Sequence, residues 1–176
     1  MLSRESRRVW RTCKRIWRRM PGRPRVILGG VDDPMSDGQY YPIGDTIRLR
    51  PKMLRARPDL FLRCFAHEII HSTGHQKRLS RQSLVDAVAP QPTSPITSTA
   101  PLTLPVLQHA CDKLSAIKTE DCVAELGGAK LLIALGAFPS RHAGTCLNYL
   151  SNNNYQFNSV DIEDRAEEAV SYVLNN

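Results

Sequence analysis

The sequence lacks the features of several protein classes. Its five cysteines are an odd number without a Cys-x-x-Cys pair, which argues against a disulfide framework and against a zinc knuckle made of thiolates. No apolar run approaches the roughly 20 residues that a membrane-spanning helix needs. The basic N-terminus also lacks the uninterrupted apolar region of a secretory signal, so we expect a soluble, cytoplasmic protein with reduced thiols.

The excess of basic over acidic residues is concentrated in the N-terminal segment. The formal net charge of the chain is +7, and the first 20 residues hold eight basic side chains against one acidic side chain. This segment therefore accounts for the whole net charge, and the rest of the chain is electrically balanced.

Residues 1–22 are predicted to form a basic amphipathic helix that Pro21-Gly22 ends. Apolar residues recur there with helical spacing, at Val9, Trp10, Cys13, Ile16, Trp17 and Met20. The arginines on the other side are candidate nucleic-acid contacts, in particular for single-stranded DNA: Arg7, Arg8, Arg11, Arg15, Arg18 and Arg19. Such a helix can bind phosphates or an anionic membrane surface, or it can dock its tryptophan face on the domain and leave its arginines in solvent.

The remaining residues, 23–176, are predicted to form one domain. Patterns of short apolar runs and turn residues predict a strand at 25–30, a hairpin with strands at 39–42 and 46–50, and a helix at 60–72 that ends near Gly74. Five prolines and six Ser/Thr residues predict a loop at 89–105. Further helices are expected at 106–117, 119–135, 141–150 and 160–174. Strands followed by helices indicate the α+β class.

The residues most informative about function are His67-Glu68-Ile69-Ile70-His71, inside the predicted helix at 60–72. Positions i and i+4 lie one turn apart on one face of a helix, so both imidazoles can bind one metal ion, for which we expect Zn²⁺. Glu68 is then placed to act as the general base that takes a proton from the attacking water.

A catalytic zinc site takes three protein ligands, so a further ligand is needed. The motif His-Glu-x-x-His-x-x-Gly-x-x-His would supply it at position 77, but this chain has Lys77 there. His75 follows the predicted helix end and is interpreted as a structural residue or as support for a ligand. An acidic cluster lies downstream at residues 120–125, and within it Asp121 and Glu125 lie one helical turn apart. Either can bind the metal while the other accepts the free N–H of a histidine ligand.

Three stretches together resemble the zincin-like metallopeptidase domain of ArdC-type antirestriction proteins, which is related to domains of plasmid and phage polyvalent proteins. They are residues 38–47, residues 66–75 with Arg78-Leu79, and residues 120–127. The resemblance runs from about residue 24 to the C-terminus. It implies a small zincin-like domain with a short antiparallel sheet beside the active-site helix, a mostly helical C-terminal part, and metal ligands on two helices.

The chain also departs from this family. The family usually has Glu-Glu where this chain has Glu120-Asp121, so the third ligand remains either Asp121 or Glu125. Family members often carry an N-terminal domain that binds single-stranded DNA, and here the basic helix precedes the catalytic part.

The motif and the resemblance together predict a zinc metallopeptidase. His142 resembles a family histidine, and we expect it to donate a hydrogen bond to the oxyanion. The substrate would be a protein or peptide, for example a host defence protein, cleaved for the benefit of a plasmid or phage. The alternative hypothesis is a catalytically vestigial, zinc-stabilised module that binds nucleic acid through the basic helix.

Overall fold

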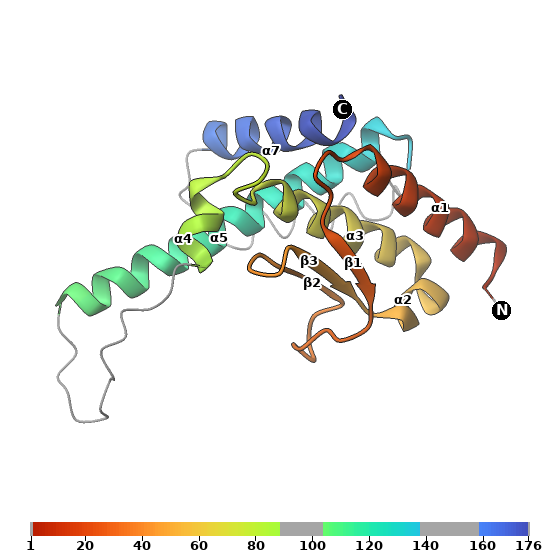
Figure 1. Ribbon diagram of the computed structural model, residues 1–176, viewed down its shortest axis with the longest axis horizontal. Helices are drawn as coiled ribbons and strands as arrows, with labels where there is room; N and C mark the ends of the chain where they lie inside the picture. Colours follow the sequence, from red (N-terminus) through yellow and green to blue (C-terminus); the bar gives the residue numbers. More distant parts are fainter. Residues whose placement is uncertain (1, 89–103, 138–158, 176) are drawn as a thin grey trace.

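The computed structural model describes residues 2–88, 104–137 and 159–175 (Figure 1). Along the described chain the elements are α1 (Arg4–Arg19), β1 (Arg25–Leu28), β2 (Gly38–Tyr41), β3 (Thr46–Leu49), α2 (Pro51–Ala56), α3 (Pro58–Thr73), α4 (Gln82–Val88), α5 (Leu104–Ala134) and α7 (Ser159–Leu174). A small sheet is followed by a helical C-terminal part, which confirms the predicted α+β fold.

The sheet has three strands in the order β1-β3-β2. The predicted hairpin is present, with β2 and β3 antiparallel and Tyr40 opposite Ile47. The expectation of a wholly antiparallel sheet was wrong for β1, which pairs parallel to β3 with Val26 opposite Ile47. A parallel pair needs a crossover connection, and here the loop after β1 together with β2 provides it. The sheet is therefore mixed.

Helix α1 docks on the domain through its apolar face. The Ser3 hydroxyl caps the helix by accepting a hydrogen bond from the Ser6 backbone N–H at 3.0 Å. Val9, Cys13 and Ile16 are buried, and the helix packs against α3, α2 and α7. All eight basic side chains of α1 are exposed. The predicted amphipathic helix is thus confirmed, in the arrangement that leaves its arginines in solvent.

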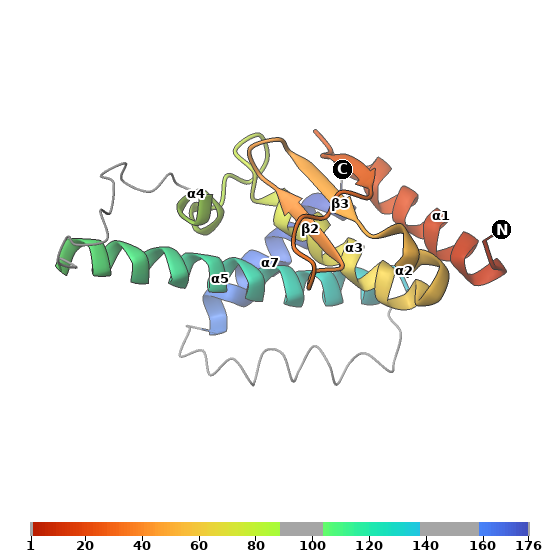
Figure 2. The same ribbon diagram turned by 90° about the horizontal axis from the view of Figure 1, so that it is seen from below.

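Helix α3 occupies the centre of the described fold. It contacts α1 and the sheet on one side and α5 on the other, and α7 crosses α5 and packs against it (Figures 1 and 2). Its side chains Phe61, Phe65, Ile69 and Ile70 are almost completely buried, as expected for a helix covered on both sides. The helix that carries the His-Glu-x-x-His motif is therefore held by the core itself.

The end of α3 differs in detail from the prediction. Gly74 does end the helix, but its φ of −72° lies in the right-handed helical region. The position therefore does not need glycine for a left-handed conformation. A Cβ at Gly74 would lie 2.9 Å from Nη2 of Arg81. Glycine leaves room there for the Arg81 guanidinium, which a Cβ would force to shift.

An arginine in the loop after α3 ties that loop to the hairpin turn. Arg78 pairs with Asp45, and its Nη2 donates to the Tyr40 hydroxyl at 3.2 Å. Its Nε also donates to the Ser72 carbonyl at 2.6 Å. Burial opposes ionisation of Asp45, but hydrogen bonds from Arg78 and Tyr40 outweigh it and lower the pKa of Asp45. The turn between β2 and β3 is thereby fixed against the end of α3.

The C-terminal helices also differ from the prediction. Residues 104–134 form one helix, α5, where two helices at 106–117 and 119–135 were expected. The sequence between them contains no proline or glycine, and the Thr119 hydroxyl bonds back to the Ser115 carbonyl at 2.9 Å, which a continuous helix permits. The expected helix at 160–174 is confirmed as α7.

Other predictions lie partly or wholly outside the described residues. These are the loop at 89–105, of which the last two residues begin α5, and the helix at 141–150. The short helices α2 and α4 were not predicted. The strand expected at 25–30 ends at Leu28, since Gly29 and Gly30 have positive φ values of 117° and 66°.

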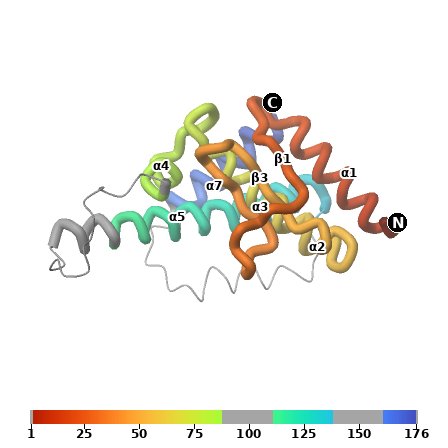
Figure 3. Tube along the Cα trace, turned by 60° about the horizontal axis from the view of Figure 1, so that its bottom comes forward, coloured from red at the N-terminus to blue at the C-terminus, as the bar shows by residue number. Residues whose placement is uncertain are grey.

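The end of α1 and the end of α7 lie side by side. The tube view shows the chain's C-terminus beside the last turn of α1 (Figure 3). The Tyr172 hydroxyl on α7 donates to the Pro21 carbonyl at 3.2 Å. Among the helices of the described stretches, none is both long and apolar enough to cross a membrane.

Candidate metal centre

Two glycines let α5 approach α3 closely at the motif. A Cβ at Gly127 would lie 2.9 Å from Cγ2 of Ile70, and one at Gly128 would lie 3.1 Å from the backbone nitrogen of His67. Any larger residue would separate the helices. The acidic cluster of α5, less than two turns before these glycines, is thereby brought over the histidines of α3.

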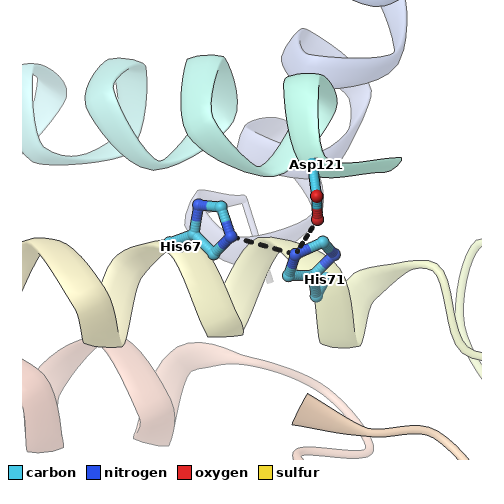
Figure 4. A group of neighbouring side chains, drawn as sticks. All are labelled: His67, His71 and Asp121. Carbon is cyan, nitrogen blue, oxygen red and sulfur yellow. Dashed lines mark hydrogen bonds and ion pairs between the residues drawn. The ribbon is translucent and has the colours of Figure 1, made fainter. Parts of the chain in front are cut away.

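The structure brings His67, His71 and Asp121 together (Figure 4). Nε2 of His67 lies 3.0 Å from Nε2 of His71, and Oδ1 of Asp121 lies 3.4 Å from that same nitrogen of His71. One donor atom from each residue lies within 4.8 Å of the others. Donors bound tetrahedrally to zinc at about 2.0–2.1 Å are separated by about 3.3 Å, so the three atoms are spaced suitably for one ion.

The other ring nitrogens face glutamates of α5. Nδ1 of His67 lies 3.3 Å from Oε2 of Glu125, and Nδ1 of His71 lies 3.6 Å from Oε1 of Glu120. A carboxylate at Nδ1 holds the proton there and turns the lone pair of Nε2 toward a metal. Asp121 thus lies with the Nε2 atoms of the histidines, whereas Glu125 lies behind His67.

A positive charge between the two imidazoles would satisfy this arrangement. A neutral imidazole has one N–H, and if both N–H groups point at glutamates, two lone pairs face each other at 3.0 Å. A shared proton or a metal ion resolves the conflict. Burial disfavours the charged form of His71, but its interactions with Asp121 and Glu120 outweigh burial and raise the pKa of His71 to about 10. The donor set therefore fits a divalent cation, which would compete with this proton.

Each glutamate is in turn paired with an arginine. Glu125 pairs with Arg63, which lies one turn before His67 on α3. Glu120 pairs with Arg81, whose side chain is 3 % exposed. Each histidine therefore contacts a glutamate that in turn contacts an arginine.

The pair of Glu120 and Arg81, next to His71, is more deeply buried than the pair of Glu125 and Arg63. Besides Arg81, the Ser83 hydroxyl donates to Oε2 of Glu120 at 2.7 Å, and Arg81 also donates to the Ile70 carbonyl at 2.8 Å. Burial opposes ionisation of Glu120, yet hydrogen bonds with His71 and Arg81 outweigh it and lower its pKa to about 2. Glu120 is thus a fixed anion behind His71.

Supporting roles of Glu120, Arg63 and Arg81 were not predicted from the sequence. Glu120 lies in the acidic cluster that was singled out, but only Asp121 and Glu125 were considered as ligands or supports. Arg63 could have been found from its spacing of four residues before His67. Nothing in the sequence indicates Arg81, which reaches Glu120 only because the chain turns back after α3 into α4.

Glu68 is buried, with 6 % of its surface exposed. In the described part of the chain no side chain or backbone group forms a hydrogen bond or ion pair with its carboxylate. Burying a carboxylate that no described group pairs with costs free energy, and carboxylates in such surroundings are found at functional sites. Taking up a proton during a reaction is one function of such a carboxylate.

Of the three other histidines, only His75 has a described side chain, and it does not join the cluster. His75 is buried, and its Nδ1 accepts the Lys77 backbone N–H at 3.2 Å. It is not among the residues whose donor atoms converge, and its role as a structural residue or as support for a ligand stays a prediction. His142 lies outside the described residues.

The fold and the converging donor atoms define an α+β domain with a candidate metal centre between two helices. No family model matches the chain, and none of the curated proteins matches its sequence. Its fold is similar to that of the antirestriction protein ArdC from plasmid R388, which has been solved in metal-free and Mn(II)-bound crystal structures.

The likeness to ArdC extends over most of this chain. The metal-free structure covers 92% of it at 18% identity with a TM-score of 0.54, and the Mn(II)-bound structure covers 94% at 16% identity with a TM-score of 0.56. The chain matches 48% and 51% of these two ArdC chains, so it spans about half of their length. The predicted resemblance is confirmed as a shared fold.

Proposed function

We propose that this protein is a zinc-dependent peptidase of ArdC type, in which His67, His71 and Asp121 hold one ion. The observation that carries the proposal is the convergence of two Nε2 atoms and a carboxylate oxygen, each imidazole being backed by a glutamate. Two histidines and one carboxylate are a common ligand set of catalytic zinc, which keeps a position open for water or substrate. The Mn(II) bound in the ArdC structure supports a divalent ion at this fold.

The ion, when bound, would lower the pKa of water and polarise the carbonyl of a peptide bond. Glu68 would take the proton of the attacking water and pass it to the nitrogen of the leaving amine. Glu125 and Glu120 would hold the two imidazoles in the required tautomer. The role predicted for His142, hydrogen bonding to the oxyanion, remains a prediction.

The substrate class follows from the proposed reaction and from the relative. A zincin site cleaves peptide bonds, and ArdC is named an antirestriction protein. We infer that the substrate is a protein of a host defence system and that its cleavage protects entering plasmid or phage DNA.

The alternative, a vestigial module that binds nucleic acid through α1, remains a hypothesis. The exposed arginines of α1 are compatible with it. Glu68 supports the enzyme hypothesis, because a module that needs metal only for stability has no use for a buried carboxylate that no described residue bonds or pairs with.

The experiment compares Glu68→Gln with wild type for metal content and for cleavage of proteins in an extract of host cells. The substitution is nearly isosteric and leaves all three proposed ligands in place. We expect unchanged metal content and a fall in turnover of about 10² or more, the scale of a lost general base.

A matched control is Glu167→Gln on α7, where an exposed glutamate pairs with Lys130 at 2.7 Å. It removes the same charge far from the motif and should cleave like wild type. Full cleavage by Glu68→Gln would exclude the proposed mechanism even if the metal ligands were confirmed.

A further inference from the structure

A small apolar pocket lies between α1, β1 and α3, and its volume is about 180 Å³. Its lining residues are Trp10, Cys13, Lys14, Trp17, Val26 and Phe65. Both tryptophans of the chain are among them. The pocket is separate from the metal centre, because Phe65 and His67 are two residues apart on α3 and therefore point in nearly opposite directions, about 200° apart.

The interior of the pocket offers few polar groups. Cys13 and Phe65 are almost completely buried, and the Trp17 indole N–H is already donated to the Pro24 carbonyl at 2.7 Å. Trp10 is held by an edge contact with Phe61, with ring centroids 6.3 Å apart. A nucleobase inserted here would leave its ring donors and acceptors without hydrogen bonds. An aliphatic or phenyl side chain has no such groups to leave unpaired.

Cations surround this apolar interior. Nζ of Lys14 lies 5.3 Å from the centroid of Trp10, and the Arg23 guanidinium lies 4.3 Å from the centroid of Trp17. At 100° per residue, Arg7 and Arg18 lie on the same side of α1 as Lys14, and both are exposed. An apolar pocket with a cationic rim is complementary to an apolar group flanked by anions.

We propose that this pocket is a docking site for an acidic polypeptide segment that inserts one large apolar side chain between the two tryptophans. Carboxylates on either side of that anchor would pair with Lys14 and Arg23. The basic face of α1, which the metal centre does not use, would then recognise a protein partner and not a nucleic acid. The proposal does not depend on peptidase activity.

The test uses intrinsic fluorescence, since the only tryptophans in the sequence line the pocket. The full chain is titrated with a synthetic peptide of Glu and Asp residues around a central Leu, and with the same peptide carrying Ala in place of Leu. We expect a fluorescence change that saturates with the Leu peptide and an affinity at least tenfold lower for the Ala peptide.

Two charge variants locate the binding surface. Lys14→Glu should weaken binding of the Leu peptide at least tenfold. Arg8→Glu changes the net charge equally but lies about 120° away around α1, so it should have a much smaller effect. Both side chains are exposed, so neither variant should impair folding.

A single-stranded oligo(dT) tests the other partner class. If it changes the fluorescence and the acidic Leu peptide does not, the surface binds nucleic acid and the proposal is wrong. Equal affinity for the Leu and Ala peptides, or equal effects of the two charge variants, would also overturn it, because binding would then be electrostatic without use of the pocket.

Discussion

Oδ1 of Asp121 lies 3.4 Å from Nε2 of His71, on the side of the ring that faces His67. One turn later on α5, Glu125 lies at the opposite nitrogen of His67. Two acidic side chains on one face of one helix therefore have different surroundings. This difference separates a proposed metal ligand from a residue that supports a ligand.

The first prediction is that Asp121→Asn and Glu125→Gln differ in metal affinity. Asp121→Asn removes the proposed anionic ligand and should abolish stoichiometric zinc. Glu125→Gln removes a support of His67 and should weaken zinc about 10–100-fold. Zinc titration with a competing chelator measures both. Equal and negligible effects would contradict the assignment of the second helix.

The second prediction concerns the buried contact between Arg81 and Glu120. Arg81→Met leaves Glu120 buried without its cation and should lower the free energy of unfolding by about 3–5 kcal/mol. Arg81→Lys keeps the charge but loses the bidentate contact with Glu120. Its free energy of unfolding should therefore lie between those of wild type and Arg81→Met. Urea unfolding gives the values. Arg57→Met, which removes an exposed arginine paired with Asp37 outside this network, should cost at most about 1 kcal/mol.

Metal binding separates a supporting role of Glu120 from a purely structural one. Arg81→Met and Glu120→Gln should both weaken zinc binding when measured under conditions where the variants are folded. If the variants are destabilised but bind zinc like wild type, the contacts behind His71 contribute to the fold alone.

The sequence predicted the parts of the site that depend on local spacing. The histidines at i and i+4 lie on one face of a helix whatever the rest of the chain does, and so do Asp121 and Glu125. Which of the two acids faces the Nε2 atoms depends on how α5 crosses α3. That crossing is set by the close contacts of Gly127 and Gly128, which no periodicity in the sequence shows.

The fold was predictable to a similar degree. The hairpin and the motif helix follow from alternation and helical spacing, whereas the parallel pairing of β1 with β3 is a long-range contact without a local signal. The prediction divided the single long helix α5 into two helices because it assumed a break near residue 118. No helix-breaking residue is present there, and α5 has tertiary contacts with α3, α4 and α7.

The third prediction tests the close approach of the helices. Within a helix, Gly→Ala normally stabilises by about 1 kcal/mol, since alanine restricts the unfolded chain. At Gly128 the new Cβ would lie 3.1 Å from the backbone nitrogen of His67. We therefore expect Gly128→Ala to lower both the thermal stability and the zinc affinity.

A control is Gly44→Ala, where the nearest atom lies 3.5 Å away at ordinary contact distance. It should leave zinc binding unchanged. A stabilised Gly128→Ala variant with normal zinc affinity would show that the spacing of α3 and α5 is not set at this glycine.

The fourth prediction concerns acid stability. The pKa of Asp45 is lower in the folded protein than its usual value of 3.8. Its ionised form therefore stabilises the fold at higher pH, and this contribution is lost as the pH falls below 3.8 through the folded pKa. Asp45→Asn should lower stability at neutral pH and reduce the further loss of stability toward about pH 3.

Urea unfolding of wild type and Asp45→Asn across this pH range checks the prediction. Asparagine also tolerates the positive φ of 44° at this position, so the turn should be preserved. Asp32→Asn, at an exposed pair with Arg48, serves as the control and should change little. Parallel pH dependences of wild type and Asp45→Asn would contradict the assigned role of the pair with Arg78.

The central claim is that one metal ion is held by His67, His71 and Asp121. The most direct measurement is an anomalous difference map at the zinc absorption edge, from crystals of the full chain grown with zinc. We predict one strong peak at about 2.0–2.2 Å from Nε2 of His67, Nε2 of His71 and a carboxylate oxygen of Asp121, with Glu125 and Glu120 at the Nδ1 atoms. A peak coordinated by Glu125 or His75 in place of Asp121, or no peak between the two helices, would contradict the account.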